Sequence, residues 1–214
     1  MVKQKINASD VMVLINEFKA ELLNARLNNV YDINNRCFLF KLTKENKDKK
    51  FVLLDSNPQS PRFQITKQSF ERRTIPSSFC SKLRKHLTNK KITMIRQLGS
   101  DRILDLQFGF DNKFHIIMEL YDSGNLILTD NNYKILTLVR RYTLNNDDEE
   151  NILTIKVGNT YPTNQVCLNL NEISAELLKK NIEKCFSDNK KNSLRNVFIS
   201  ATSPIVNLGK DIIY

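Results

Sequence analysis

The side chains in this sequence that could hold a metal ion, or act as nucleophile and base, are few and scattered. Neither His86 nor His115 has a second ligand near it in the pattern of a zinc site, and no two cysteines form a C-x-x-C pair. The four cysteines are Cys37, Cys80, Cys167 and Cys185. No G-x-x-x-x-G-K phosphate loop and no G-x-S-x-G motif occurs. We therefore expect no catalytic residue, no cofactor and no metal site.

The chemistry that the sequence does offer is electrostatic. The 33 Lys and Arg residues outnumber the 23 Asp and Glu residues, which gives a net charge of +10 and a pI near 9.4. The segment from Arg62 to Arg96 contains ten basic residues and one acid, Glu71, so it carries a net charge of +9. The basic residues are Arg62, Lys67, Arg72, Arg73, Lys82, Arg84, Lys85, Lys90, Lys91 and Arg96.

This concentration of charge favours a surface that binds a polyanion over the alternatives, which are a solvated helix face and a Lys-rich codon bias. Nucleic acid is the first candidate and an anionic membrane surface the second. Nothing in the segment specifies bases, so a folded RNA recognised through its backbone and shape fits better than a DNA sequence. The residues expected to contact phosphates are Arg72, Arg73, Lys82, Arg84, Lys85, His86, Lys90 and Lys91.

The elements that must position these residues can be predicted from hydrophobic spacing. Asn7 and Asp10 are typical of a helix start, and apolar residues at helical spacing predict a helix from about residue 8 to 24. A second helix is expected to begin near Pro76. Short apolar runs separated by turn residues predict strands at 28–33, 37–42, 51–55, 62–66, 92–98, 103–108, 114–120, 125–129 and 135–140. Asp105, Gln107 and Glu119 alternate with apolar residues, so we expect them on a solvent-facing side of a sheet.

This order of elements predicts an α+β fold with antiparallel sheets and no internal repeat. We expect a β-rich domain at 1–143, an acidic loop and linker at 144–170, and the start of a helical module at 171–214. The chain is expected to be a fragment of a longer protein. No stretch approaches the roughly 18 apolar residues of a membrane span, and the cysteine pattern favours a cytosolic protein with reduced thiols.

Three stretches of the sequence, in this order, resemble a known family. They are Phe79-Cys80-Ser81-Lys82-Leu83-Arg84-Lys85-His86-Leu87, then Arg96-Gln97-Leu98-Gly99-Ser100-Asp101-Arg102-Ile103-Leu104-Asp105-Leu106-Gln107-Phe108, then Glu119-Leu120-Tyr121-Asp122-Ser123-Gly124-Asn125-Leu126-Ile127-Leu128-Thr129-Asp130. Together with the starts of the first helix and the first strand, they are similar to the amino-terminal domain of the NFACT proteins. The resemblance covers residues 3 to 142 closely and the remainder more loosely.

The resemblance implies a role in ribosome-associated quality control. Members of the family bind a large ribosomal subunit that holds an obstructed nascent chain on its tRNA, and they recruit tRNA for mRNA-independent tailing of that chain. The family also implies partnership with an E3 ubiquitin ligase of the listerin type, through regions outside this chain. The implied location is the cytoplasm, with the nucleus as a second location, and no membrane partner is expected.

The resemblance also implies a fold and three site residues. The fold is that of the amino-terminal domain of formamidopyrimidine-DNA glycosylases, followed by a helix-hairpin-helix-like module. Three family positions linked to tail synthesis correspond to Asp10, Asp101 and Arg102, which we expect to position tRNA. For Asp10 a simple helix cap is an equal alternative.

Two other classes of function stay open on the sequence alone. Glycosylases of this fold use an amino-terminal proline, whereas this chain begins Met1-Val2-Lys3. Glycosylase chemistry is therefore not expected, although a lyase that uses the amine of Lys3 or Lys5 is the enzyme alternative. The other alternative is a scaffold that binds proteins through its strand surface.

Overall fold

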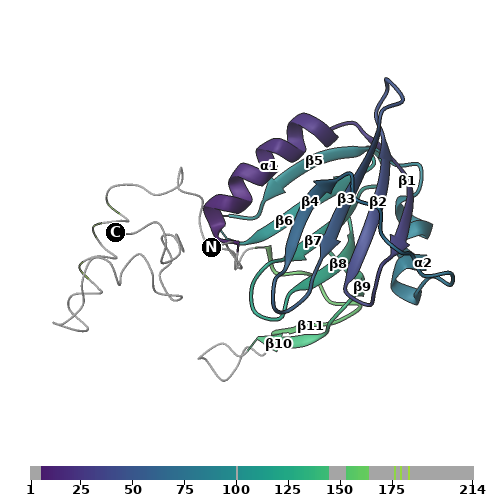
Figure 1. Cartoon of the computed structure of the whole chain (residues 1–214). Helices are drawn as coiled ribbons and strands as arrows, with labels where there is room; N and C mark the ends of the chain where they lie inside the picture. Colours follow the sequence, from purple (N-terminus) through teal and green to yellow (C-terminus); the bar gives the residue numbers. More distant parts are fainter. Residues whose placement is uncertain are drawn as a thin grey trace.

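A computed structural model of the chain describes residues 6–99, 101–144 and 153–163, together with Glu176, Lys179 and Glu183. Two helices and eleven strands have bounds within this described part (Figure 1). They are α1 (Ala8–Leu22), β1 (Arg26–Asp32), β2 (Cys37–Thr43), β3 (Lys49–Asp55), β4 (Arg62–Thr66), α2 (Ser78–Leu87), β5 (Ile92–Gln97), β6 (Ile103–Phe108), β7 (Phe114–Glu119), β8 (Asn125–Asp130), β9 (Ile135–Leu138), β10 (Tyr142–Leu144) and β11 (Leu153–Ile155).

The helix α1 begins where the sequence predicts, because Asn7 and Asp10 cap each other's backbone. The Asn7 side chain accepts a hydrogen bond from the Asp10 amide, and the Asp10 carboxylate accepts one from the Asn7 amide, each at 2.8 Å. Val11, Ile15 and Phe18 line the buried face of the helix. The chain turns away two residues after Leu22, at Asn24, whose φ of 66° is left-handed.

The strands form two antiparallel sheets in which spatial order follows chain order. One sheet contains β1 to β4 and the other contains β5 to β9, while β10 and β11 form a separate ribbon. The predicted antiparallel α+β class is confirmed. The likeness to the glycosylase domain stays a prediction, and the predicted helical module at 171–214 lies almost entirely outside the described residues.

A single apolar core joins α1, α2 and one face of each sheet. Phe38 and Phe40 of β2 and Phe108 of β6 are all at most 2% exposed, and the ring of Phe18 in α1 packs edge-on against Phe63 of β4 at 4.9 Å between centroids. Large aromatic side chains of this kind dominate core energetics. The core therefore holds both helices in fixed positions on one body, with α1 lying along β5 (Figure 1).

The opposite face of the five-stranded sheet is also buried, which the alternating sequence pattern did not predict. Asp105 is 0% exposed and Glu119 is 1% exposed, so the expectation that they face solvent is wrong, whereas Gln107 is partly exposed. The cause is a cover of tyrosines: the hydroxyl of Tyr133 donates to Asp105 at 2.9 Å, and that of Tyr161 donates to Glu119 at 3.0 Å.

Residues beyond the expected domain end at 143 contribute to this cover. Strand β11 lies within the expected linker and pairs with β10, and Thr160 bridges to Lys134. Tyr161 is 3% exposed and packs with the apolar residues of this face. The boundaries at 143 and 170 stay predictions, but residues 153–163 pack with the five-stranded sheet.

Glu119 provides a test of this cover. Its carboxylate accepts hydrogen bonds from the hydroxyls of Tyr121, Tyr142 and Tyr161. Burial raises the pKa of Glu119, and the three hydroxyls oppose that shift. We expect Glu119→Ala to lower the free energy of unfolding by about 2 to 4 kcal/mol, because it leaves buried donors without an acceptor. Tyr161→Phe, which removes one donor only, is expected to cost about 1 kcal/mol.

Urea unfolding followed by circular dichroism measures both changes. If Glu119→Ala unfolds at the same denaturant concentration as the parent chain, the tyrosine cover does not contribute to stability as we describe.

Candidate nucleic-acid interface

The helix α2 lies along the whole length of β1 and gathers the basic segment there. At its start, the Asp32 carboxylate accepts hydrogen bonds from the amide and hydroxyl of Ser77, at 2.9 and 2.7 Å. In its middle, Nε of Arg84 donates to the carbonyl of Val30 at 2.7 Å. Beyond its end, the Asn89 amide donates to the carbonyl of Leu27 at 2.8 Å. The predicted phosphate contacts therefore follow one helix and one strand.

We call these residues the α2 surface. They are Arg72, Arg73, Lys82, Arg84, Lys85, His86, Lys90 and Lys91. Within the described part of the chain, only Lys91 among them is ion-paired with a carboxylate, that of Glu45 at 2.7 Å. Two other basic residues of the segment are paired away from this surface, Arg62 with Asp55 at 3.7 Å and Arg96 with Asp105 at 3.0 Å. The positive charge along α2 is thus largely uncompensated by carboxylates of the described residues.

Aromatic rings hold several of these side chains in place. The Nζ of Lys90 lies 5.3 Å from the ring centroid of Phe114, and the imidazole of His86 lies 5.0 Å from the same ring. Lys82 reaches toward β9, where its Nζ is 3.4 Å from the carbonyl of Leu136. These contacts order part of the surface before any ligand binds, which lowers the entropy cost of binding.

His86 differs from the other members of the surface in its charge. Burial lowers the pKa of its imidazole, and the neighbouring ammonium groups of Lys85, Lys82 and Lys90 lower it further. A lowered pKa favours the neutral form of an imidazole at neutral pH. His86 can therefore offer a hydrogen bond to a phosphate at neutral pH, whereas the lysines and arginines supply the charge.

The first turn of α1, which contains Asp10, is connected to the turn that contains Asp101 and Arg102. The side-chain amide of Gln97 donates to the carbonyl of Ala8 at 3.0 Å and to the carbonyl of Asp101 at 2.7 Å. This residue ties the first turn of α1 to the turn between β5 and β6. The Asp101 carboxylate also accepts a hydrogen bond from the Arg102 amide at 2.6 Å, which fixes the turn.

The α2 surface and these three residues do not lie at the same end of the domain. Lys90 and Lys91 immediately precede β5, and Asp101 follows its other end. A strand of six residues spans about 20 Å. Figure 1 shows the same separation, with α2 and the start of α1 at opposite sides of the molecule. The predicted phosphate contacts and the predicted tRNA-positioning residues are therefore two separate groups.

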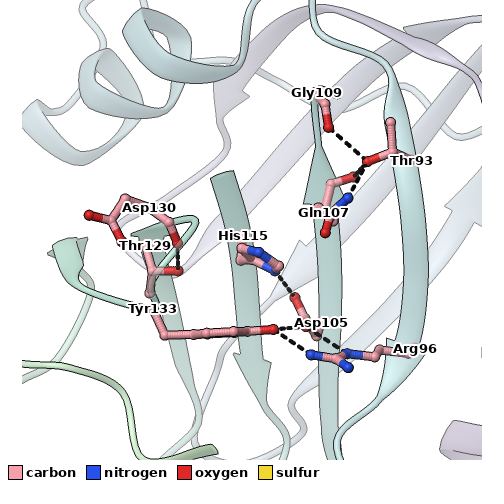
Figure 2. Close-up of polar contacts among 9 residues, drawn as sticks. All are labelled: Thr93, Arg96, Asp105, Gln107, Gly109, His115, Thr129, Asp130 and Tyr133. Carbon is pink, nitrogen blue, oxygen red and sulfur yellow. Dashed lines mark hydrogen bonds and ion pairs between the residues drawn. The ribbon is translucent and has the colours of Figure 1, made fainter. Parts of the chain in front are cut away.

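The buried face of the five-stranded sheet contains a network that resembles a catalytic arrangement (Figure 2). Asp105 Oδ1 lies 2.8 Å from Nδ1 of His115, and Asp105 Oδ2 lies 3.0 Å from Nε of Arg96. The Tyr133 hydroxyl also donates to Oδ2, and burial, with the Asp105 charge, raises the pKa of Tyr133 to about 12. His115 is 3% exposed and lies under the Tyr133 ring, so substrate has no access to this His–Asp pair.

The thiols of the described residues are also unsuited to catalysis. Cys37 and Cys80 are buried and free, and burial raises the pKa of each to about 12. Across the described residues, no group of three or more His, Cys, Asp or Glu side chains could hold a metal ion.

Two depressions of about 300 and 310 Å³ lie beside the β2–β3 turn, where Lys44 and Glu45 contribute to both. Neither depression contains the His115–Asp105 pair.

Sequence reasoning missed Gln97 and Tyr133, each of which connects two elements. Gln97 was predicted only as part of a strand and of the second family stretch, with no contact of its own, and Tyr133 lies in a polar turn with a left-handed φ of 59°. The alternation of Asp105, His115 and Glu119 with apolar residues was the available signal for a polar face, but it does not reveal what covers that face.

None of the helices in the described residues is sufficiently long and apolar to span a membrane.

The fold and the interface together define an antiparallel α+β domain with a basic helix on one side, and comparisons with known proteins agree on its family. A family model described as NFACT N-terminal and middle domains matches residues 8–207. The chain therefore belongs to the NFACT family, as its sequence motifs predicted.

Curated relatives are named for ribosome quality control. The human protein named ribosome quality control complex subunit NEMF is 39% identical over 162 residues, which are 75% of this chain and 14% of that protein. The Saccharomyces cerevisiae protein named ribosome quality control complex subunit 2 is 39% identical over 141 residues, covering 65% of this chain and 13% of that protein. The chain thus spans about a seventh of the length of these relatives.

A solved structure shows the same fold at lower identity. The N-terminal region of the fibronectin/fibrinogen-binding protein from Streptococcus suis matches with a TM-score of 0.74 and 24% identity, covering 97% of this chain and 76% of that one. At this identity the match establishes the fold alone.

Gln97 allows the connection between α1 and the β5–β6 turn to be tested. Gln97→Leu removes two hydrogen bonds, so we expect faster amide exchange at the turn and a loss of about 1 to 2 kcal/mol in the free energy of unfolding. Gln107→Leu is the matched control, because its side chain donates to Thr93 at the other end of the same strand pair. Equal exchange at the turn in both variants would contradict the role we give to Gln97.

The pKa of His86 can be measured directly by NMR titration of its ring protons. We expect the pKa of His86 to lie below that of a histidine in an unstructured peptide. Replacing both Lys82 and Lys85 with alanine should raise it, because two positive charges are removed. A pKa at or above about 6.5 in the parent chain would contradict this account.

Proposed function

We propose that this chain is the RNA-binding domain of a ribosome-associated quality control factor. In this proposal it contacts a large ribosomal subunit that carries peptidyl-tRNA and helps to recruit tRNA for mRNA-independent tailing of the nascent chain. The observation that carries the proposal is the positive charge along α2, most of which no carboxylate of the described residues compensates, in a family whose curated relatives are named for ribosome quality control.

The physical basis is the release of counterions. Each phosphate that is neutralised by a lysine or arginine frees a condensed cation, so a row of unpaired basic side chains gains affinity for RNA without reading its bases. Lys82, Lys85 and Lys90 form no ion pair with a described carboxylate, and the ring contact of Lys90 positions its ammonium group. Such a surface suits a folded RNA recognised by its backbone.

The tRNA-positioning residues have a different role in the proposal from the α2 surface. Asp10, Asp101 and Arg102 would position tRNA, while the α2 surface, about one strand length away, would contact phosphates of the same or a neighbouring RNA. Any peptide bond would be formed by the ribosome, so the chain would act as a binding domain and not as an enzyme. The E3 ligase partner would contact regions of the longer protein outside this chain.

Filter binding of the chain to tRNA over a salt series tests the proposal. We expect the triple variant Lys82→Ala, Lys85→Ala, Lys90→Ala to reduce the slope of log affinity against log salt by about 2 to 3, since each lost phosphate contact removes roughly 0.7 to 0.9. The matched control is Lys19→Ala, Lys47→Ala, Lys49→Ala, which removes the same charge from exposed lysines of α1 and the β2–β3 hairpin.

Binding that is absent at low salt, or that falls equally in both triple variants, would contradict the proposal. A covalent adduct of the chain with abasic DNA, trapped by borohydride, would instead support the enzyme alternative.

A further inference from the structure

Two arginines of the α2 surface meet on the ring of Tyr31. The Cζ of Arg72 lies 4.1 Å from the centroid of the Tyr31 ring, and the Cζ of Arg84 lies 5.8 Å from the same centroid. Arg84 is held further by the hydrogen bond from its Nε to the carbonyl of Val30, at 2.7 Å. Both guanidinium groups are therefore fixed by the body of the domain.

No carboxylate of the described residues lies within ion-pair distance of either arginine. Asp32, the neighbour of Tyr31 in β1, is 2% exposed and accepts both hydrogen bonds from Ser77. Glu71, the neighbour of Arg72, is exposed and forms no ion pair with a described residue. Two like charges held close together repel each other, so the arrangement favours a bound anion near them. The forked donors of arginine match the oxygens of a phosphate.

The contact between Arg72 and Tyr31 also fixes a flat group at the surface. Arg72 is exposed, so its guanidinium can be contacted by a ligand while the Tyr31 ring supports it from the domain side. Guanidinium planes and aromatic rings are the groups on which unpaired RNA bases stack. In a duplex the faces of a base are covered by its neighbours, so such a group selects an unpaired nucleotide.

We propose that Tyr31, Arg72 and Arg84 form a subsite for one unpaired nucleotide of an RNA. The base stacks on the Arg72 guanidinium, and the Nη groups of Arg84 contact the adjacent phosphate. This inference rests on the proposed function, to which it adds a preference for single-stranded RNA at this end of the α2 surface.

Fluorescence anisotropy with two labelled probes tests the subsite: a ten-nucleotide oligouridine and a ten-base-pair RNA duplex. Arg72→Lys keeps the charge and loses the flat group. We expect it to weaken oligouridine binding by about fivefold or more and to change duplex binding by less than about twofold. Arg62→Lys is the matched control, because Arg62 is also exposed and is paired with Asp55 away from the α2 surface.

A second variant tests whether the Tyr31 ring is needed to hold Arg72. Tyr31→Leu removes the ring beneath Arg72 and should produce the same selective loss, in protein whose circular dichroism melt confirms that it is folded. Equal losses for both probes in Arg72→Lys, no loss for either probe, or the same selective loss in Arg62→Lys would each overturn the subsite and leave the proposed function standing. If the parent chain binds neither probe, the proposed function and the subsite both fail.

Discussion

Three buried carboxylates accept hydrogen bonds inside the domain and are therefore unavailable to pair with its surface lysines. Asp105 accepts hydrogen bonds within the five-stranded sheet, Glu119 accepts them from three tyrosines, and Asp32 accepts two from Ser77 at the start of α2. Burying a charge without partners is costly, so these acids must keep their donors and cannot turn outward to pair with surface lysines. Asp32, the acid beside the start of α2, therefore supports the fold, and most of the α2 surface is left without a carboxylate partner among the described residues.

The same core that buries these acids sets the distance between the two groups of predicted site residues. Strand β5 begins beside Lys91 and ends at Gln97, which holds the first turn of α1 against Asp101. Both groups are thus attached to regular elements, the first to α2 and β1 and the second to α1 and β5. A ligand that reaches both must be at least as long as a strand, as a folded RNA is and a small substrate is not.

The sequence predicted the elements well and the contacts between them poorly. The Asn7–Asp10 cap, the strands and the basic helix each depend on residues close together in the chain, so local patterns were sufficient to find them. The burial of Asp105 and Glu119 depends on Tyr133, Tyr142 and Tyr161, which come later in the chain, and no local pattern reveals that cover. The pairing of Lys91 with Glu45 was missed for the same reason, because 46 residues separate them.

The positions of the predicted site residues could also be expected where they depend on one segment of the chain, but not where they depend on the fold. Concentrated charge between Arg62 and Arg96 is a property of one segment, so its exposure along α2 could be expected. The separation of that surface from Asp10, Asp101 and Arg102 depends on the course of β5 and could not be read from spacing. The roles of all these residues in RNA binding stay predictions, whereas membership of the NFACT family is confirmed.

Lysine reactivity measured by mass spectrometry, with and without tRNA, tests the central claim most directly. If the free charge along α2 is the RNA-contacting surface, tRNA will slow acetylation of Lys82, Lys85 and Lys90, while the exposed Lys47 and Lys49 on the β2–β3 hairpin will react at unchanged rates. Protection that is uniform over these five lysines, or that is confined to Lys47 and Lys49, would contradict the account.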